Sequence, residues 1–287
     1  MEFAIGLLIV LVGLLLQFVA GPFRFVWIEP PVNDIVFWLY ILVVWSVSIR
    51  FKESRAVRWL GSIRSAVGSI AWTLALTLVL GLVRQQPVPF RTFPGFSDML
   101  SNWSFLLVFL WLLTSMACAV DRVCRPLTLK KVPFLLYHLG LFLALLCGFM
   151  GKAEVRRCSM TLSVGDSSCH AVSQDGSDSL LPFSIELTGF QMPYFENCET
   201  DTQIPRQFIS NVRIDDGLSS KDCRISVNHP AKSGNWHIYQ YGYEGDNTSV
   251  FRIIYDPWRY KVLLGILIMF AGAICLFVQI SKRKRTE

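Results

Sequence analysis

Six long apolar runs constrain the fold of this chain more than any other feature. They cover residues 3–20, 35–49, 66–83, 103–120, 132–150 and 260–280, and each carries few or no charged side chains. A bilayer core about 30 Å thick needs roughly 20 helical residues to cross it. Only 17% of the 287 residues are charged, whereas a soluble domain has about a quarter. The sequence therefore predicts an integral membrane protein with about six transmembrane α-helices.

Two of these runs leave an alternative open. Residues 35–49 are short for a span unless residues 31–34 extend the helix. The first run has the length of a secretory signal peptide, but Met1 and Glu2 provide no basic start, and Phe18-Val19-Ala20 is a weak cleavage site. We therefore expect a retained helix.

Basic residues predict the orientation in the membrane. They gather in three places, which are the loop after the second run (Arg50, Lys52, Arg55, Arg58, Arg64), the loop after the fourth run (Arg122, Arg125, Lys130, Lys131) and the C-terminal tail (residues 282–285). Loops rich in Lys and Arg face the cytoplasm. We therefore expect cytoplasmic termini in the cytoplasmic (inner) membrane, with residues 151–258 outside. Because each basic group lies beside a span, topology explains them better than nucleic-acid binding does.

The segment 151–258 reads as a separate domain. Its polarity rises at Gly151, and strand-like alternation follows in 159–164, 182–188, 207–214, 223–227, 236–243 and 250–255, with turn residues between them. Residues 163–179 are polar and read as an exposed loop. This predicts an extracytoplasmic antiparallel β-rich domain, a sandwich or barrel, between helices 5 and 6. The predicted divisions are 1–60 (two helices and a cytoplasmic loop), 61–150 (three helices), 151–258 (β-domain) and 259–287 (last helix and tail).

Four of the eight cysteines lie in the predicted outer domain, where an oxidising compartment favours two disulfides. The spacing does not fix their pairing. A thiol-exchange role is the alternative, although no Cys-x-x-Cys pair supports it, and closely spaced metal ligands are missing. The four residues are Cys158, Cys169, Cys198 and Cys223.

His138 is the one histidine within an apolar run. Coordinating side chains in a span are costly, so such a residue is a functional candidate. At 3.6 residues per turn it shares a face with Phe142 and Phe149, opposite the small residues Gly140, Ala144 and Gly148. This pattern suits a haem axial ligand beside apolar walls. A neutral ring bonded to a neighbouring helix, with the phenylalanines facing lipid, is the alternative.

The other histidines give a weaker signal. His229 and His237 flank a predicted loop, and His170 lies beside Cys169. For all three we favour ordinary surface residues over ligands. The sequence contains no recognisable catalytic triad, phosphate-binding loop or paired-carboxylate site, so autonomous hydrolytic or nucleotide chemistry is not expected.

Several stretches resemble the ResB (CcsB) cytochrome c biogenesis proteins. The most specific is Val227-Asn228-His229-Pro230 followed by Tyr239-Gln240 and Tyr243; Tyr137-His138-Leu-Gly140, Met160-Thr-Leu-Ser-Val-Gly165, Arg206-Gln-Phe-Ile-Ser-Asn-Val and Asp256-Pro-Trp258 match more loosely. The similarity covers roughly residues 60–285.

The resemblance implies a role in the system II pathway. There, a ResB-like protein and a CcsA/ResC-like protein carrying a tryptophan-rich WWD motif move haem b across the membrane and assist its attachment to apocytochrome c. It implies that His138 is an axial ligand of the haem iron and that the partner supplies a second ligand. The helix periodicity described above adds Phe142 and Phe149 as residues expected to line the haem. A thioredoxin-like thiol reductant is a further implied partner.

This chain departs from the pattern of the family and its partner in three ways. It has no WWD motif, so the resemblance implies a non-autonomous subunit of a holocytochrome c synthase complex, with membrane lipid as its surroundings. Its outer domain is short, and its first two helices are additional. The alternatives are a non-haem envelope scaffold or partner-binding protein anchored by its helices, and a small transporter. The transporter is disfavoured because intramembrane charge pairs and an inverted repeat are not evident.

Overall fold

The computed structural model describes residues 2–85, 95–194 and 205–286 of the chain. Two compact units are present. The helical unit comprises Met1–Ala153 and Trp258–Glu287, and the β unit comprises Glu154–Pro257. Each unit is described by itself.

The helical unit has six helices that are long and apolar enough to cross a membrane within the described part of the chain. This confirms the predicted multi-pass membrane architecture. The helix after Pro31 is 19 residues long, so the second span does extend to the N-terminal side of the apolar run. The six are α1 (Glu2–Ala20), α2 (Val32–Arg50), α4 (Ile63–Leu82), α5 (Trp103–Cys124), α6 (Val132–Gly151) and α7 (Arg259–Thr286).

Polar caps and short helices join the spans. Ser54 caps the short α3 (Arg55–Leu60), Ser62 caps α4 and Asn102 caps α5, each by accepting a hydrogen bond from a backbone N–H of the first turn. Such caps satisfy donors that the start of a helix leaves open. The 3₁₀ helices are η1 (Phe25–Ile28), η2 (Phe96–Ser101) and η3 (Leu129–Lys131).

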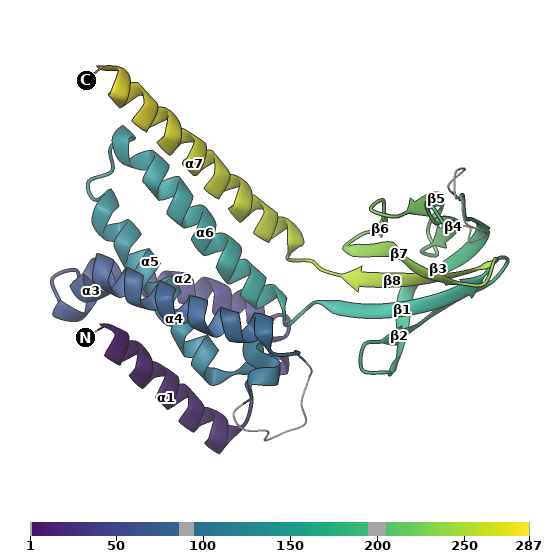
Figure 1. Ribbon diagram of the computed structural model, residues 1–287, viewed down its shortest axis with the longest axis horizontal. Coiled ribbons are helices and arrows are strands. Elements are labelled where there is room, and N and C mark those ends of the chain that lie inside the picture. The colour runs from purple at the N-terminus through teal and green to yellow at the C-terminus, as the bar shows by residue number, and fades with distance from the viewer. Residues whose placement is uncertain (1, 86–94, 195–204, 287) are drawn as a thin grey trace, which may run out of the picture. The chain divides into compact units, whose positions relative to one another are not determined.

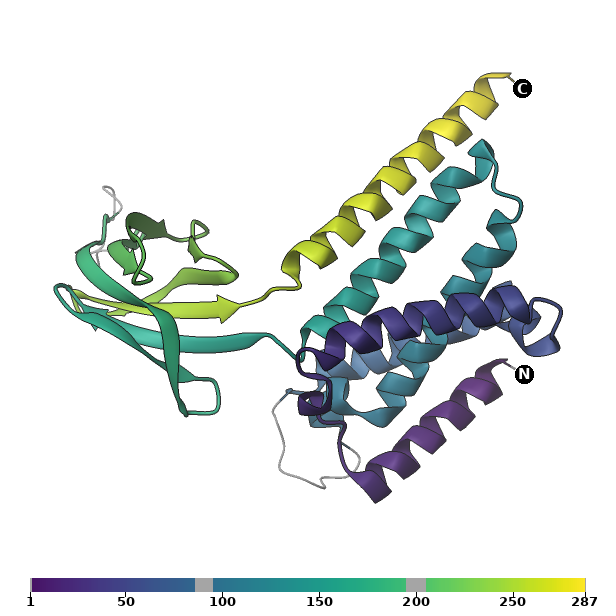
Figure 2. The same cartoon turned by 180° about the vertical axis from the view of Figure 1, so that it is seen from behind.

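α5 is the central helix of the unit. It packs against α1, α2, α3, α4 and α6, and 67% of its span is buried, whereas only 11% of the α7 span is buried. α7 packs along α6, and the two run side by side in both views (Figures 1 and 2). Helices that cover one another this little present apolar surface to the outside, as expected of a protein in lipid.

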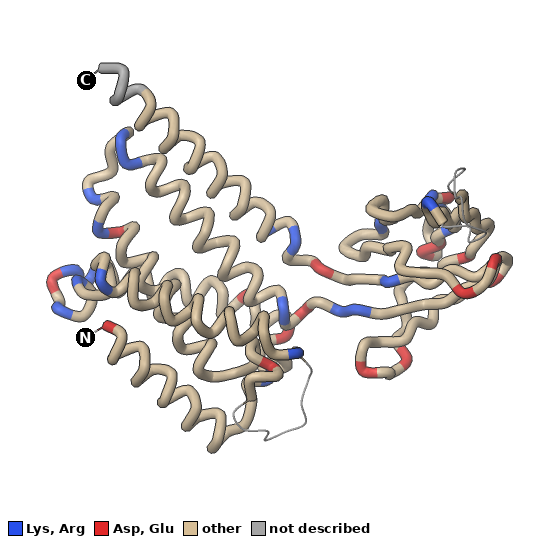
Figure 3. The backbone as a smooth tube through the Cα atoms, viewed as in Figure 1, with Lys and Arg blue, Asp and Glu red and all other residues tan. Residues whose placement is uncertain are grey.

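Some Lys and Arg lie around the start of α7 (Figure 3). A larger group, on α3 and on the turn between α5 and α6, lies at the opposite end of the helical unit. This end is called the basic end below. The predicted clustering of Lys and Arg in these two loops therefore becomes a single region in space.

The described residues of the β unit form one antiparallel sheet of eight strands in the order β5-β4-β3-β2-β1-β8-β7-β6. Alternation of buried and exposed residues, as in Leu181, Phe183, Ile185 and Leu187 of β3, places one face of the sheet on the core. The strands are β1 (Arg156–Ser163), β2 (Ser167–Ser173), β3 (Asp178–Gln191), β4 (Ile209–Asp215), β5 (Ser220–Ser226), β6 (Ala231–Ser233), β7 (Trp236–Glu244) and β8 (Thr248–Tyr255).

The sheet curls so that its ends approach each other. β5 contacts β6 and β7, which lie at the far end of the strand order. All six predicted strands are present in the antiparallel arrangement expected, but the expected loop at residues 163–179 is wrong. It contains β2, whose polar serines and histidine alternate with the buried Ala171 and pair with β1 and β3.

Candidate functional site

His138 lies in the second turn of α6 and is half-buried. Its Nδ1 lies 3.0 Å from the carbonyl oxygen of Phe134, one turn earlier in the helix. Because a carbonyl only accepts, Nδ1 carries the proton and donates it. The ring also lies over Phe134, with 4.0 Å between the ring centroids. These two contacts orient the imidazole on its own helix.

The opposite ring nitrogen is therefore the chemically available one. With Nδ1 protonated, Nε2 of a neutral imidazole holds a lone pair. Among the described residues, Nε2 has no hydrogen-bond partner. A histidine whose first nitrogen donates to a backbone carbonyl and whose second is open has the arrangement found in metal-ligating histidines.

The two phenylalanines predicted to line a haem have partners within the chain. Phe142 is 1% exposed and packs between Tyr40 and Trp45 of α2. Phe149 is half-buried and contacts Phe25 and Phe109. The rings that share a helix face with His138 thus attach α6 to α2, η1 and α5.

The small residues Gly140 and Ala144 of α6 form the contact with α7. A Cβ on Gly140 would lie 2.3 Å from the backbone nitrogen of Met269, and one on Gly265 would lie 2.6 Å from that of Ala144. Gly148 takes no part, because a Cβ there would meet nothing within 4 Å. His138 lies on the other side of α6, so its ring is outside this tight helix contact.

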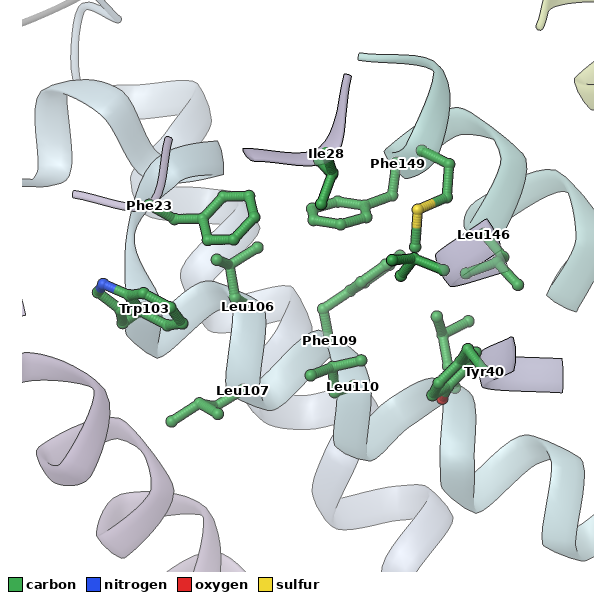
Figure 4. Close-up of a pocket in the computed structure, with 13 residues that line it drawn as sticks. Phe23, Ile28, Tyr40, Trp103, Leu106, Leu107, Phe109, Leu110, Leu146 and Phe149 are labelled. Carbon is green, nitrogen blue, oxygen red and sulfur yellow. The ribbon is translucent and has the colours of Figure 1, made fainter. Parts of the chain in front are cut away.

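A wholly apolar pocket of about 210 Å³ lies near the end of the helical unit opposite the basic end. Figure 4 shows Phe23, Trp103, Phe109 and Phe149 around it, drawn from the α1–α2 connection, α5 and α6. Of these residues, the sequence pointed only to Phe149 as a candidate for ligand binding. The others come from distant segments, and their residue types are those of ordinary membrane helices, so no sequence signal marks the pocket.

The family-motif residues of the β unit build its fold. Asn228 has a φ of +66°, which the tight turn joining β5 to β6 requires, and Ser226 pairs with His229 across that turn. Asparagine tolerates this left-handed conformation better than most residues. His229 is exposed and Pro230 is half-buried. These residues define the path of the chain into β6.

Gln240 links three strands. Its Oε1 accepts a hydrogen bond from Ser210 Oγ at 2.6 Å, and its Nε2 donates to Ser249 Oγ at 2.7 Å and to the Gly242 carbonyl at 2.8 Å. The register shift between β7 and β8 falls at this residue. Gln240 therefore satisfies the polar groups of a bulge within the curled sheet.

The two tyrosines of the motif differ in their surroundings. Tyr243 is exposed and its ring lies 4.7 Å from that of Phe208, at the end of the sheet. Tyr239 is half-buried on β7 and lies beside His237, with 6.3 Å between the ring centroids.

The expectation of an ordinary surface residue is wrong for His237, which is 1% exposed. It lies on β7 between Lys232 of β6 and Ile254 of β8. Its neighbours in sequence, Trp236 and Ile238, point to the other face of the sheet, so alternation alone could not reveal that both faces are covered at this point. His170 is exposed as expected and pairs with Asp178 at 3.0 Å.

The disulfide prediction is not confirmed. Cys158, Cys169 and Cys223 are free thiols, and Cys198 lies outside the described residues. Cys158 belongs to the core of the β unit, opposite Ser173 and Ile253 in register. Within residues 2–85, 95–194 and 205–286, no group of three His, Cys, Asp or Glu side chains could hold a metal ion.

Comparison with known proteins supports the resemblance drawn from the motifs. Residues 127–254 match the model of the ResB-like family, which confirms the resemblance over the segment from the α5–α6 turn to the end of β8. The comparison with curated proteins found no match.

Among solved structures, the chain is similar to one titled "Cytochrome c Heme Lyase CcmF", with 14% sequence identity and a TM-score of 0.39. The alignment covers 75% of this chain and 37% of that one, so the chain spans little more than a third of that protein's length. At this TM-score the likeness supports no inference about fold or function.

Proposed function

We propose, from the match of residues 127–254 to the ResB-like family, that this chain acts in cytochrome c biogenesis. In this proposal it is a subunit of a membrane complex that delivers haem across the membrane for covalent attachment to apocytochromes c. Haem b is its cargo, and Nε2 of His138 is an axial ligand of the iron.

The observation that carries the proposal is the state of the His138 ring. The hydrogen bond from Nδ1 to the Phe134 carbonyl holds the tautomer in which Nε2 can bind iron, and Nε2 has no other partner in the described chain. Iron porphyrin is commonly held by a histidine ligand of this kind. The ring is half-buried on an apolar helix, where a flat apolar macrocycle finds a suitable surface.

One chain supplies only part of such a site. Phe142 is already buried against α2, so further walls must come from another protein. A CcsA/ResC-like partner with a WWD motif would provide them, together with a second axial ligand. This makes the chain a non-autonomous subunit and not a complete synthase.

The β unit provides the surface for apocytochrome c or the partner in this proposal. Arg252 lies 3.7 Å above the ring of Tyr241, which is 60% exposed, and His229 is exposed in the β5–β6 turn. Exposed aromatic and arginine side chains of this kind are typical of protein contact surfaces.

The test is the absorption spectrum of the complex purified with its partner. His138→Ala should reduce the haem band strongly, and added imidazole should restore it by occupying the vacated ligand position. His170→Ala, which removes an exposed histidine from the β unit outside this contact surface, is the matched control and should leave the spectrum unchanged.

An unaltered spectrum in His138→Ala would remove this residue from the haem site. If cells lacking the chain also made normal amounts of cytochrome c, the alternative of a non-haem envelope scaffold would be favoured. A scaffold would lose partner binding without any change in haem content.

A further inference from the structure

A pocket of about 500 Å³ opens at the basic end of the helical unit. It lies where α3, the start of α4 and the end of α5 meet. The α5 residue, Arg122, is distant in sequence from the others. Its lining consists of Arg55, Arg58, Trp59, Ser62, Arg64 and Arg122. Four guanidinium groups therefore converge on one place.

The pocket lining contains no carboxylate. None of the four arginines forms an ion pair with a described Asp or Glu, whereas the nearby Arg125 is paired with Asp121. Glu2 acts electrostatically on Arg64, and Arg122 donates to the Gly61 carbonyl at 3.4 Å. Arg58 and Arg122 also line a neighbouring pocket together with Glu53 and Asp121. The positive charge of the arginine pocket is therefore only partly compensated.

Trp59 adds a further donor. Its Nε1 is buried and has no hydrogen-bond partner among the described residues. The indole is held in place by stacking on Trp111, with 5.9 Å between ring centroids and 12° between the planes. An unsatisfied buried N–H is costly, so this group favours a ligand that accepts hydrogen bonds.

The pocket has a fixed floor. Trp111 Nε1 donates to Ser65 Oγ at 2.9 Å, and Ser115 Oγ donates to the Leu60 carbonyl at 2.8 Å. A Cβ on Gly61 would lie 2.9 Å from the Cys118 carbonyl oxygen, so α3 and α5 are in close contact there. These contacts hold the arginine-bearing elements together independently of the arginines themselves.

The position within the molecule indicates the source of the ligand. The pocket lies at the ends of membrane spans, which is the depth of lipid headgroups. Next to Ser62, the side chain of Ile63 is 83% exposed, so an apolar surface adjoins the charged pocket. Arginine binds phosphate through two parallel N–H bonds, and basic pockets between helices at this depth suit anionic lipid headgroups.

We infer that this pocket binds the phosphate group of an anionic phospholipid, with the four arginines and Trp59 Nε1–H as donors and the acyl chains lying along the exposed start of α4. Placement of Lys and Arg for topology alone needs only charges on the loops. It does not need them gathered around a buried indole N–H that lacks a hydrogen-bond partner among the described residues. The inference is independent of the haem proposal.

The test uses the full-length chain purified in detergent, with bound lipid counted by native mass spectrometry. Phosphatidylglycerol should be retained in preference to phosphatidylcholine. The variant Arg55→Gln/Arg58→Gln/Arg64→Gln should lower phosphatidylglycerol affinity on the order of tenfold or more, since each basic residue near a lipid surface contributes about 1 kcal/mol. Arg50→Gln/Lys130→Gln/Lys131→Gln removes the same charge outside the pocket and should lower it much less.

A second variant keeps the test informative if the triple variant folds poorly. Trp59→Phe retains the stacked ring and every charge but removes the N–H, and a several-fold weaker affinity supports the inference. Equal losses in the two triple variants, or no change in Trp59→Phe, would overturn the pocket as the site. Displacement of the lipid by inorganic phosphate alone would identify a free-phosphate site and overturn the lipid assignment.

Discussion

In the β unit, both polar atoms of the Gln240 amide are hydrogen-bonded within the sheet, whereas in the helical unit His138 keeps Nε2 open. Both residues belong to stretches that carry the family resemblance. The difference suggests two separate roles for residues within these stretches, one in the stability of the fold and one in ligand binding. The side chain of Gln240 is hydrogen-bonded within the sheet, and its removal should lower the stability of the β unit. His138 is held in orientation but left available, and its loss should be felt in ligand binding.

The same contrast exists between the two sides of α6. Toward α7, Gly140 and Gly265 bring the backbones so close that a single methyl group would clash. On the side of His138 the ring is half-buried. The face of α6 that carries Gly140 therefore fixes the position of the helix against α7. The His138 ring, on the opposite face, is not needed to hold the helix in place.

The largest expected loss of stability comes from disrupting the close contact between α6 and α7 at Gly140. Gly140→Leu should destabilise the helical unit by about 3 kcal/mol or prevent α6–α7 packing, because overpacking of a tight contact costs 1–3 kcal/mol or more. Thermal unfolding in detergent, followed by size-exclusion chromatography, measures this. Gly148→Leu on the open part of the same helix is the control and should change stability by less than about 0.5 kcal/mol. Equal effects would contradict the packing described here.

Removing the hydrogen-bonded side-chain amide of Gln240 should destabilise the β unit. Gln240→Ala removes the hydrogen bonds to Ser210, Ser249 and the Gly242 carbonyl. The two serine hydroxyls still contact each other at 2.9 Å, and the lost bonds should cost about 2 kcal/mol. The rate at which the buried Cys158 thiol is labelled in urea reports unfolding of this unit. Gln191→Ala, an exposed glutamine at the end of β3, should have little effect. The haem spectrum of the Gln240→Ala complex should be retained, which separates stability from binding.

Removing the imidazole of His138 should abolish haem binding and change stability little. His138→Gln should change the unfolding free energy by less than about 1 kcal/mol, because the ring is half-buried and its one hydrogen bond goes to a carbonyl already used by the helix. The haem spectrum should be lost. A large drop in stability with an intact spectrum would mean that His138 is a structural residue like Gln240.

The smallest effect concerns a turn of the β unit. Hydrogen bonds from the backbone N–H groups of Ser219 and Leu218 hold the pKa of Asp216 below its ordinary value of 3.8. The contribution of this carboxylate to stability is therefore complete above pH 3.8 and disappears as the pH falls through the lower folded-state pKa. Pulse proteolysis with pepsin should find wild type more resistant than Asp216→Asn at pH 5, with the gap closing toward pH 2. A gap independent of pH would mean that the charge is irrelevant.

Local patterns predicted much of this architecture because they depend on neighbours in sequence. Runs of apolar residues gave the spans, and alternation with turn residues gave six strands in the positions found. β2 was missed because its serines and histidine look like a loop, and only pairing with β1 and β3 makes it a strand. His237 was misread as a surface residue because its burial depends on elements distant in sequence.

The sequence by itself determined that the chain lies in a membrane, that its β unit precedes the last span, and that it carries a ResB-like motif, because hydropathy and residue order are local properties. Only the tertiary structure decided that Phe142 packs against α2, that Gln240 satisfies the polar groups of a β-bulge, and that arginines distant in sequence line one pocket with Trp59. These facts depend on which side chains meet across helices and strands, and that is set by packing of segments far apart in the chain.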